Sequence, residues 1–343
     1  MSTTNSLGEH GGYIDFTAIQ KRNQVFDEIK IQKQIAGINT YFFSLGRHCL
    51  KFLLLRNQKK IIYMPKYTCS SVKSIAKNCN YNIVYYNLEH NFHPILPDIS
   101  NGSIVLLNNY FGLTFDSCNE FILKHRGGGF NIVVDNTHSI GINNQFGKTS
   151  SFISPRKFLP VTDGGILYAK SCSNEQHYLP KDNDHSWDRV QWLFRCIDQG
   201  SKASSYSEYV NFRKSLQNVP YRQMSNTTKT IIKMININEV VRKRNLLYKS
   251  LKKCLDISEC FESVKLPLLF TPIGFPLKVR DSETTQKVLG EKGIYTVRYW
   301  PELNNILIKD EFEYYLLNKI VIVSLQSAPT EMQIEKITQL GET

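Results

Sequence analysis

The sequence has no long apolar run, no cysteine pair with metal-ligand spacing and no low-complexity tract. Without an apolar run long enough to span a bilayer, no transmembrane helix and no membrane partner are expected. The first residues, Met1 to Gly12, lack a basic start followed by an apolar stretch, so no signal peptide is expected either. The eight cysteines are scattered without any CxxC pair, which favours reduced thiols in a cytoplasmic protein over disulfides or a metal site.

The composition is that of a folded protein with more than one domain. The chain has 343 residues, of which 41% are hydrophobic, so it can bury a sizeable core. We expect residues 1–235 to form a large domain and residues 236–343 a smaller one. The net charge of +12 favours anionic partners, but the basic residues are spread along the chain without a dense run. No nucleic-acid partner is therefore expected.

Five short β-rich runs alternate with helical stretches between about residues 40 and 170. Each run consists of Ile, Val, Leu and Tyr bounded by Pro, Asn, Gly or Asp, as in strands that are buried on both faces. This pattern predicts a parallel α/β sheet, in which ligands bind at the carboxyl ends of the strands. The runs are Lys60 to Met64, Asn82 to Asn87, Ser103 to Asn108, Asn131 to Asp135 and Gly165 to Ala169.

The pattern becomes mainly helical after about residue 175. Ser186 to Ile197 and Ser207 to Leu216 are predicted helices, and Thr228 to Leu255 is predicted as one long helix with a bend near Asn236 to Asn238. Beyond it, Leu266 to Lys278 is expected to be extended and interrupted by prolines. Ser282 to Lys292 is expected to be a helix that ends at Gly293.

Asp135 and Lys157 are the first candidates for chemistry. Asp135 ends a predicted buried strand, where an ionised carboxylate is costly unless it meets a cation. Lys157 precedes a Thr-Asp-Gly-Gly turn, and a desolvated lysine there can act as nucleophile or base. Simpler interpretations stay open: Asp135 can cap a turn, His138 can be a core histidine, and Arg156 can be the buried cation instead of Lys157.

These residues form part of a longer pattern. Asp135-Asn-Thr-His138 is followed by Ser151-Phe, then Pro155-Arg-Lys157, then Gly164-Gly165. This order is similar to that of sugar aminotransferases of the DegT/DnrJ/EryC1/StrS family, which are fold-type I enzymes that use pyridoxal 5'-phosphate (PLP). The resemblance implies a large PLP-binding domain with a mostly parallel sheet between helices, and a smaller C-terminal α+β domain.

The resemblance also implies roles for individual residues. Lys157 would form the imine with PLP, Asp135 would contact the pyridine nitrogen, and His138 would lie near the cofactor hydroxyl. Ser154 and the turn Gly46-Arg47-His48 would hold the phosphate at a helix N-terminus. Family members often place an aromatic ring on the cofactor at the position of Cys69, so either Cys69 or the nearby Tyr67 would fill this place. Arg222 belongs to a segment that reaches the neighbouring subunit's site in the family.

The family implies an activity as well as a fold. The expected reaction transfers an amino group from an amino acid, most simply glutamate, to a nucleotide-linked keto-sugar for surface polysaccharide or related sugar biosynthesis. A homodimer with shared active sites is expected. Two alternatives remain open: a PLP-dependent dehydratase or eliminase, whose relatives replace the lysine with histidine, and a relative that binds a ligand without turnover.

Overall fold

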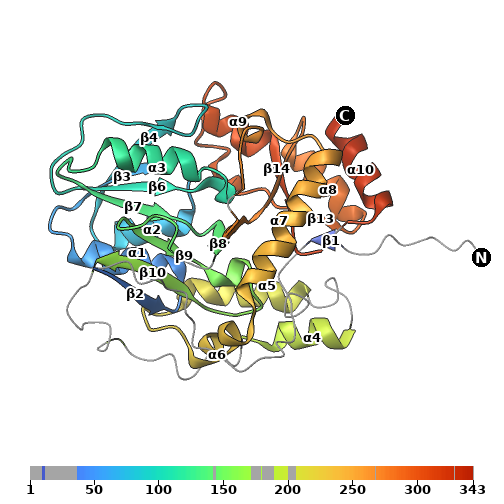
Figure 1. Ribbon diagram of the computed structural model, residues 1–343, viewed down its shortest axis with the longest axis horizontal. Helices are drawn as coiled ribbons and strands as arrows, with labels where there is room; N and C mark the ends of the chain where they lie inside the picture. Colours follow the sequence, from blue (N-terminus) through green and yellow to red (C-terminus); the bar gives the residue numbers. More distant parts are fainter. Residues whose placement is uncertain are drawn as a thin grey trace, which may run out of the picture.

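A computed structural model describes residues 10–11, 37–141, 144–170, 179, 189–199, 206–266, 268–327 and 329–342. Its largest feature is a sheet of eight strands, drawn mainly in blue and green in Figure 1. In spatial order these are β2 (Ile38–Phe43), β10 (Gly165–Lys170), β9 (Ser150–Ile153), β7 (Asn131–Asp135), β6 (Ile104–Asn108), β3 (Ile61–Pro65), β4 (Asn82–Leu88) and β5 (Pro94–Ile95).

The strand directions differ in part from the predicted parallel sheet. Strands β4, β3, β6, β7 and β9 are parallel, whereas β10 runs antiparallel to both β9 and β2, and β5 runs antiparallel to β4. The connection from β9 to β10 explains the reversal. It contains only the 3₁₀ turn η3 (Pro155–Lys157) and an irregular stretch, and a parallel pair would need a longer crossover.

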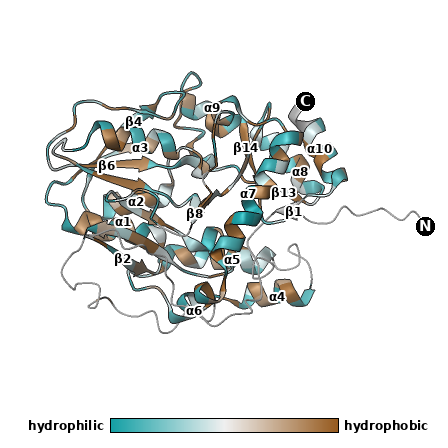
Figure 2. Cartoon of the chain, viewed as in Figure 1, coloured by the Kyte–Doolittle hydropathy of each residue, from teal (hydrophilic) through white to brown (hydrophobic). Residues whose placement is uncertain are grey.

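The central strands are buried on both faces, as their apolar runs predicted. On β6, Ile104 and Leu106 pack into one core together with residues of α1 (Gly46–Arg56) and α2 (Ser70–Asn78). Val105 and Leu107 of the same strand pack into a second core, which continues into the C-terminal part of the chain and includes residues of α3 (Phe115–Lys124). The brown colour of β6 in Figure 2 reflects this apolar composition.

The helical region contains more breaks than the sequence predicted. Helices α4 (Gln191–Gln199) and α5 (Tyr206–Ser215) overlap the two predicted segments, although residues 186–188 fall outside the described chain. The helix predicted over 228–255 with a bend near Asn236 to Asn238 is two separate helices, α6 (Asn226–Met234) and α7 (Ile237–Cys254), which are divided at the position of the predicted bend. Asn236 causes the break, because its side chain accepts a hydrogen bond from the Glu239 N–H and caps α7.

The C-terminal part pairs with earlier parts of the chain. β11 (Phe270–Pro272) pairs with β8 (Ser139–Gly141), while β12 (Gly274–Lys278) pairs with β14 (Ile320–Ser324). The remaining elements are α8 (Ser282–Glu291), α9 (Phe312–Asn318), α10 (Glu331–Glu342) and β1 (His10–Gly11), which pairs with β13 (Ile294–Tyr295). In Figure 1, α8, α10 and β14 lie on the opposite side of the picture from the strands of the large sheet. The division at residue 235 stays a prediction.

Within the described ranges, no helix has both the length and the apolar character needed to cross a membrane.

Gly165 allows β10 to approach the start of α1. A Cβ on Gly165 would lie 2.4 Å from the Leu45 carbonyl oxygen and 2.8 Å from the Gly46 nitrogen. The Gly164 N–H donates a hydrogen bond to the Ser44 carbonyl, 2.6 Å away. The Gly-Gly pair therefore fixes the N-terminus of α1 against the end of the sheet.

We expect Gly165→Ala to lower the free energy of unfolding by about 1 to 3 kcal/mol, because the backbone around Leu45 must move away. Gly290→Ala, in α8, is the matched control, since its Cβ would meet nothing within 4 Å and should be neutral or stabilising by up to about 1 kcal/mol. Urea unfolding of both variants measures the difference. Equal stabilities would contradict the close approach.

Candidate functional site

The candidate site lies where the parallel strands end, and buried amides join these ends. The Asn108 side chain at the end of β6 donates to the Thr68 hydroxyl, 2.9 Å away, which follows β3. The Asn109 side chain donates to the Asn136 side-chain oxygen after β7, 2.8 Å away. Because these two hydrogen bonds are buried, they hold the ends of three neighbouring strands in fixed relation.

Asp135 and Lys157 meet at this edge through Thr137. The Lys157 Nζ donates a 2.9 Å hydrogen bond to the Thr137 hydroxyl oxygen. The Thr137 N–H donates to the Asp135 carboxylate over 3.0 Å. Both Asp135 and Lys157 are partly accessible, although Thr137 and most other neighbours are buried. The site thus presents a partly accessible acid and a partly accessible amine on either side of Thr137.

Burial and the attraction between the two charges shift the pKa values of Asp135 and Lys157 in opposite directions. Burial raises the pKa of Asp135, while the Lys157 charge and the hydrogen bonds from Thr137 oppose the rise. Burial lowers the pKa of Lys157, an effect that Asp135 opposes and that Arg156 and Arg213 reinforce. A lysine with a lowered pKa has a larger neutral fraction at pH 7. It is therefore a better nucleophile and base than an exposed lysine.

The N-terminus of α1 lies against the same pair of segments. A Cβ on Gly46 would lie 3.4 Å from the Ser154 Cβ and 3.4 Å from the Thr137 methyl group. The first N–H groups of a helix have no partner within it, and they carry partial positive charge. Gly46, Ser154 and Thr137 therefore bring unsatisfied donors and hydroxyl groups close to Lys157.

The side chains of Arg47 and His48 point elsewhere. The Arg47 guanidinium donates to the carbonyl oxygens of Leu216 and Gln217, so only its main chain is available near Gly46. The His48 Nδ1 lies 2.9 Å from the Ser44 hydroxyl, and its ring packs edge-on against Tyr221. These contacts link α1 to the segments that follow α5.

His138 is enclosed by aromatic side chains. It stacks on Phe111 and Trp300, and its ring centroid lies 4.4 Å from that of Tyr299. Burial lowers the pKa of His138 well below its usual range, so the ring is neutral. Its Nδ1 accepts a hydrogen bond from the Phe111 N–H, which places the ring proton on Nε2. Within the described chain, the buried Nε2 has no partner.

Tyr67 and Cys69 differ in exposure. Tyr67 is buried against Tyr110 and Trp300, and its hydroxyl donates to the Tyr299 carbonyl over 3.3 Å. Cys69 is partly exposed, with its Sγ 3.0 Å from the Ser71 hydroxyl. A negative charge on Cys69 would raise the pKa of Lys157, so the two side chains share one neighbourhood. Tyr67 is thus a packing residue in this structure, and Cys69 is the partly exposed residue near Lys157.

Arg222 lies at the outer edge of the sheet. Its carbonyl accepts a 3.0 Å hydrogen bond from the Ser44 N–H, and the next residue, Gln223, forms a β-bridge with Phe43. The backbone of this segment is therefore hydrogen-bonded within its own subunit to Ser44, which lies two residues before α1 begins. The role of the half-buried Arg222 side chain across a dimer interface stays a prediction.

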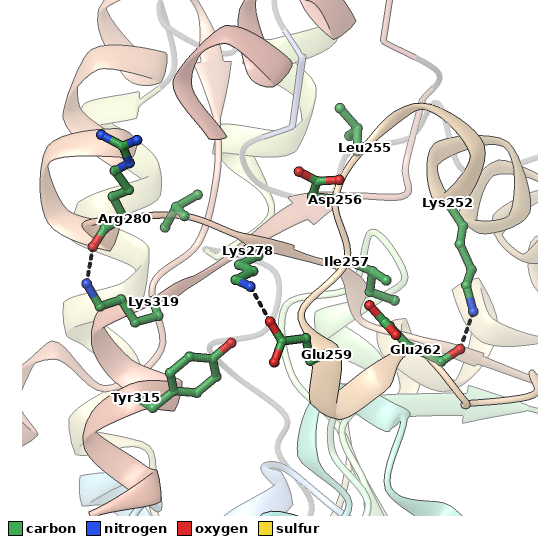
Figure 3. A pocket seen from close by; sticks show the side chains of 11 residues that line it. Lys252, Leu255, Asp256, Ile257, Glu259, Glu262, Lys278, Arg280, Tyr315 and Lys319 are labelled. Atoms are coloured by element: carbon green, nitrogen blue, oxygen red, sulfur yellow. Dashed lines mark hydrogen bonds and ion pairs between the residues drawn. The ribbon is translucent and has the colours of Figure 1, made fainter. Parts of the chain in front are cut away.

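A separate groove lies far along the chain from Lys157. Its volume is about 910 Å³, and it is lined by residues from the end of α7, from β12 and from α9 (Figure 3). Charges of both signs line it, and Lys278 pairs with Glu259 inside it. None of the predicted site residues line this groove. Across the described part of the chain, no three His, Cys, Asp or Glu residues are placed to hold a metal ion.

Sequence reasoning missed three residues near Lys157. Thr137 was part of the Asp135 motif, but its role as a bridge depends on side-chain geometry that spacing does not show. Arg156 was considered only as a substitute for Lys157, and Arg213 of α5 was not considered at all. The approach of Arg213 to Lys157 depends on a long-range contact without a local sequence signal.

The neutral state of His48 gives a testable pH dependence. Burial, with the charges of Arg47 and Lys51, lowers the pKa of His48 to about 3, whereas an unfolded histidine has a pKa of about 6.5. The unfolded chain therefore binds one more proton below pH 6.5. Because of this one proton on His48, the free energy of unfolding should fall by about 1.4 kcal/mol per pH unit as pH falls from about 6 towards 4.

We expect His48→Gln to remove this contribution from the slope measured by urea unfolding between pH 6 and 4. His90→Gln, at an exposed position, is the matched control. An unchanged slope in the His48→Gln protein would show that His48 is not held neutral.

Comparisons with known proteins find similarity in structure rather than in sequence. No protein-family model matches the chain, and no curated protein matches it. Among solved structures, Spr1654 of Streptococcus pneumoniae, described as a sugar aminotransferase and solved in a PMP form, aligns with a TM-score of 0.59 at 12% identity. That alignment covers 94% of this chain and 92% of the other.

Two further structures give the same result. A DegT DnrJ EryC1 StrS aminotransferase from Brucella abortus aligns with a TM-score of 0.56 at 11% identity, covering 91% of this chain and 87% of that one. The sugar aminotransferase CalS13 from Micromonospora echinospora aligns with a TM-score of 0.54 at 12% identity, covering 88% and 86%. The fold predicted from the sequence is confirmed: the chain has the fold of the DegT/DnrJ/EryC1/StrS aminotransferases.

Proposed function

We propose that this protein is a PLP-dependent aminotransferase that moves an amino group from an amino acid to a keto-sugar. The observation that carries the proposal is the joining of Asp135 and Lys157 through Thr137 at the carboxyl ends of the parallel strands. In this fold, that edge is where ligands bind. The aligned sugar aminotransferases support the reaction class.

The residues of the site fit PLP. Asp135 is a partly accessible acid in a buried setting, where a protonated pyridine nitrogen would supply the missing cation. His138 offers a buried N–H donor without a partner in the described chain, as a cofactor hydroxyl would require. Gly46 and Ser154 lie beside each other at a helix N-terminus, where a phosphate is favoured. The fit therefore includes three different groups of the cofactor.

When bound, PLP supplies an electron sink that stabilises negative charge on the substrate carbon next to nitrogen. Lys157 holds the cofactor and then moves a proton at that carbon, for which its lowered pKa suits it. Asp135 keeps the pyridine nitrogen protonated. Thr137 orients the Lys157 amine through their 2.9 Å hydrogen bond, and the aromatic side chains around His138 exclude water.

The finer parts of the proposal concern substrate and assembly. We expect a nucleotide-linked keto-sugar as acceptor, glutamate as donor and a role in surface polysaccharide or related sugar biosynthesis, in the cytoplasm. The net charge of +12 supports an anionic substrate. A homodimer with shared sites is proposed from the half-buried Arg222, which lies at the sheet edge close to the start of α1.

The proposal is tested by covalent attachment of PLP. Purified protein with added PLP should absorb visible light, and borohydride reduction should fix the cofactor to the peptide that contains Lys157. The matched control is Lys170→Ala, at the end of β10, which should retain the attachment. Attachment to another lysine, or none in the folded protein, would exclude the proposed function.

Asp135→Asn should retain PLP attachment but slow proton transfer by about a hundredfold or more, because a neutral amide cannot keep the pyridine nitrogen protonated. Single-turnover kinetics with glutamate measure the step, and urea unfolding controls for a structural effect. Normal turnover in the folded variant would rule out the electronic role of Asp135.

Shared sites predict complementation between two inactive chains. Mixing Lys157→Ala protein with Arg222→Ala protein should produce mixed dimers in which one of the two pockets is intact, and up to about half of the wild-type activity per mixed dimer should return. Subunit exchange is checked by native mass spectrometry. Proven exchange without recovered activity would mean that Arg222 does not act across the interface.

A further inference from the structure

We propose that Arg156, supported by Arg213, binds the phosphate group of the cofactor next to Gly46 and Ser154. This inference rests on the proposed function, because it assumes that PLP occupies the Lys157 site. It assigns an anion-binding role to two arginines for which the family pattern gave no function.

Arg156 is a partly accessible cation with one buried donor that has no partner. It follows Pro155 in the turn η3, directly before Lys157. In the described part of the chain, its Nε is inaccessible to solvent and has no hydrogen-bond partner. Leaving a guanidinium donor without an acceptor away from water is costly. Such a donor indicates a place for an anion.

The charged neighbours of Arg156 are other arginines. Burial lowers the pKa of Arg156, and Arg213 and Arg47 lower it further. Among the largest influences on Arg156, the weakly acidic side chains of Tyr209 and Cys69 oppose this effect. Arg47 donates a hydrogen bond to the Leu216 carbonyl, and Arg213 of α5 lies three residues before Leu216. Arg156, Arg47 and Arg213 thus form a cluster of three positive charges.

The position of the cluster favours the phosphate over the other end of the cofactor. Arg156 is two residues after Ser154, and Arg47 is next to Gly46, whose Cβ position lies 3.4 Å from the Ser154 Cβ. The turn that carries Arg156 therefore begins at the residue that faces the N-terminus of α1, where the phosphate is expected.

An anion-binding role and a structural role predict opposite signs of stability. Removing a partly buried charge whose Nε has no partner should leave the cofactor-free protein equally stable or more stable. If instead Arg156 stabilises the fold through contacts of its own, Arg156→Gln should destabilise the cofactor-free protein. The sign of the change in the free energy of unfolding of Arg156→Gln therefore distinguishes the two roles before any ligand is added.

The decisive experiment compares PLP with pyridoxal, which lacks the phosphate. Attachment to Lys157 is titrated by absorbance for wild type, Arg156→Gln and Arg156→Lys. We expect Arg156→Gln to weaken PLP binding by about tenfold to a hundredfold and pyridoxal binding by less than about twofold, because a charge-assisted pair is lost only with PLP. Arg156→Lys should recover part of the loss. Inorganic phosphate should protect wild type from PLP more strongly than it protects Arg156→Gln.

Arg280→Gln is the matched control, since it removes one positive charge from the distant groove of Figure 3. It should change neither titration. Equal weakening of PLP and pyridoxal, or no weakening of either, would overturn the inference. If the wild-type protein attaches neither compound, the proposed function itself fails. If the wild-type protein and Arg156→Gln attach PLP equally well, only the role of Arg156 fails.

Discussion

The pairing of Asp135 with Lys157 is the constraint on which the rest of the site depends. An acid and an amine that are largely removed from water each lose hydration, so each needs the other or a ligand of opposite charge. Thr137 makes the pairing indirect, since it accepts from the amine and donates to the acid. The two charged groups are thereby held together without closing onto each other, and a cofactor can be placed between them.

The sheet fixes the positions of Asp135 and Lys157 relative to each other. Asp135 ends β7, and Lys157 follows β9, which is hydrogen-bonded to β7 in parallel register. The reversal of β10 then returns the chain towards the start of α1, where Gly165 packs against the Leu45 backbone. The helix N-terminus is thus placed by the same turn that carries the lysine. A substitution that moves this turn would affect phosphate binding and lysine position together.

The sequence predicted the sheet more completely than the site. All five predicted runs became strands within one residue at each end, because long apolar runs bounded by turn residues leave few alternatives. The direction of β10 was missed because direction depends on the connection rather than on the strand. A bend was predicted near Asn236 to Asn238, but a complete break between α6 and α7 was not, because the apolar period continues across Asn236 and the cap depends on the geometry of its side chain.

The side-chain directions within the site were the least predictable part. Arg47 has the right position for a phosphate contact, but its guanidinium donates hydrogen bonds to the carbonyl groups of Leu216 and Gln217, which are far away in sequence. Arg156 lies within the Pro155-Arg-Lys157 segment without an assigned role, and Arg213 lies outside the pattern, so only the fold relates them. Asp135, His138, Ser154 and Lys157 were predicted together because they follow one another in a fixed order near the ends of two adjacent strands, and their roles stay a prediction.

A crystal structure of the protein with bound PLP tests the central claim most directly. We expect continuous density from the Lys157 Nζ to the cofactor, with the Asp135 carboxylate within about 2.7 to 2.9 Å of the pyridine nitrogen. Density for PLP away from Lys157, such as in the groove of Figure 3, or a bound cofactor whose ring nitrogen does not meet Asp135, would contradict it.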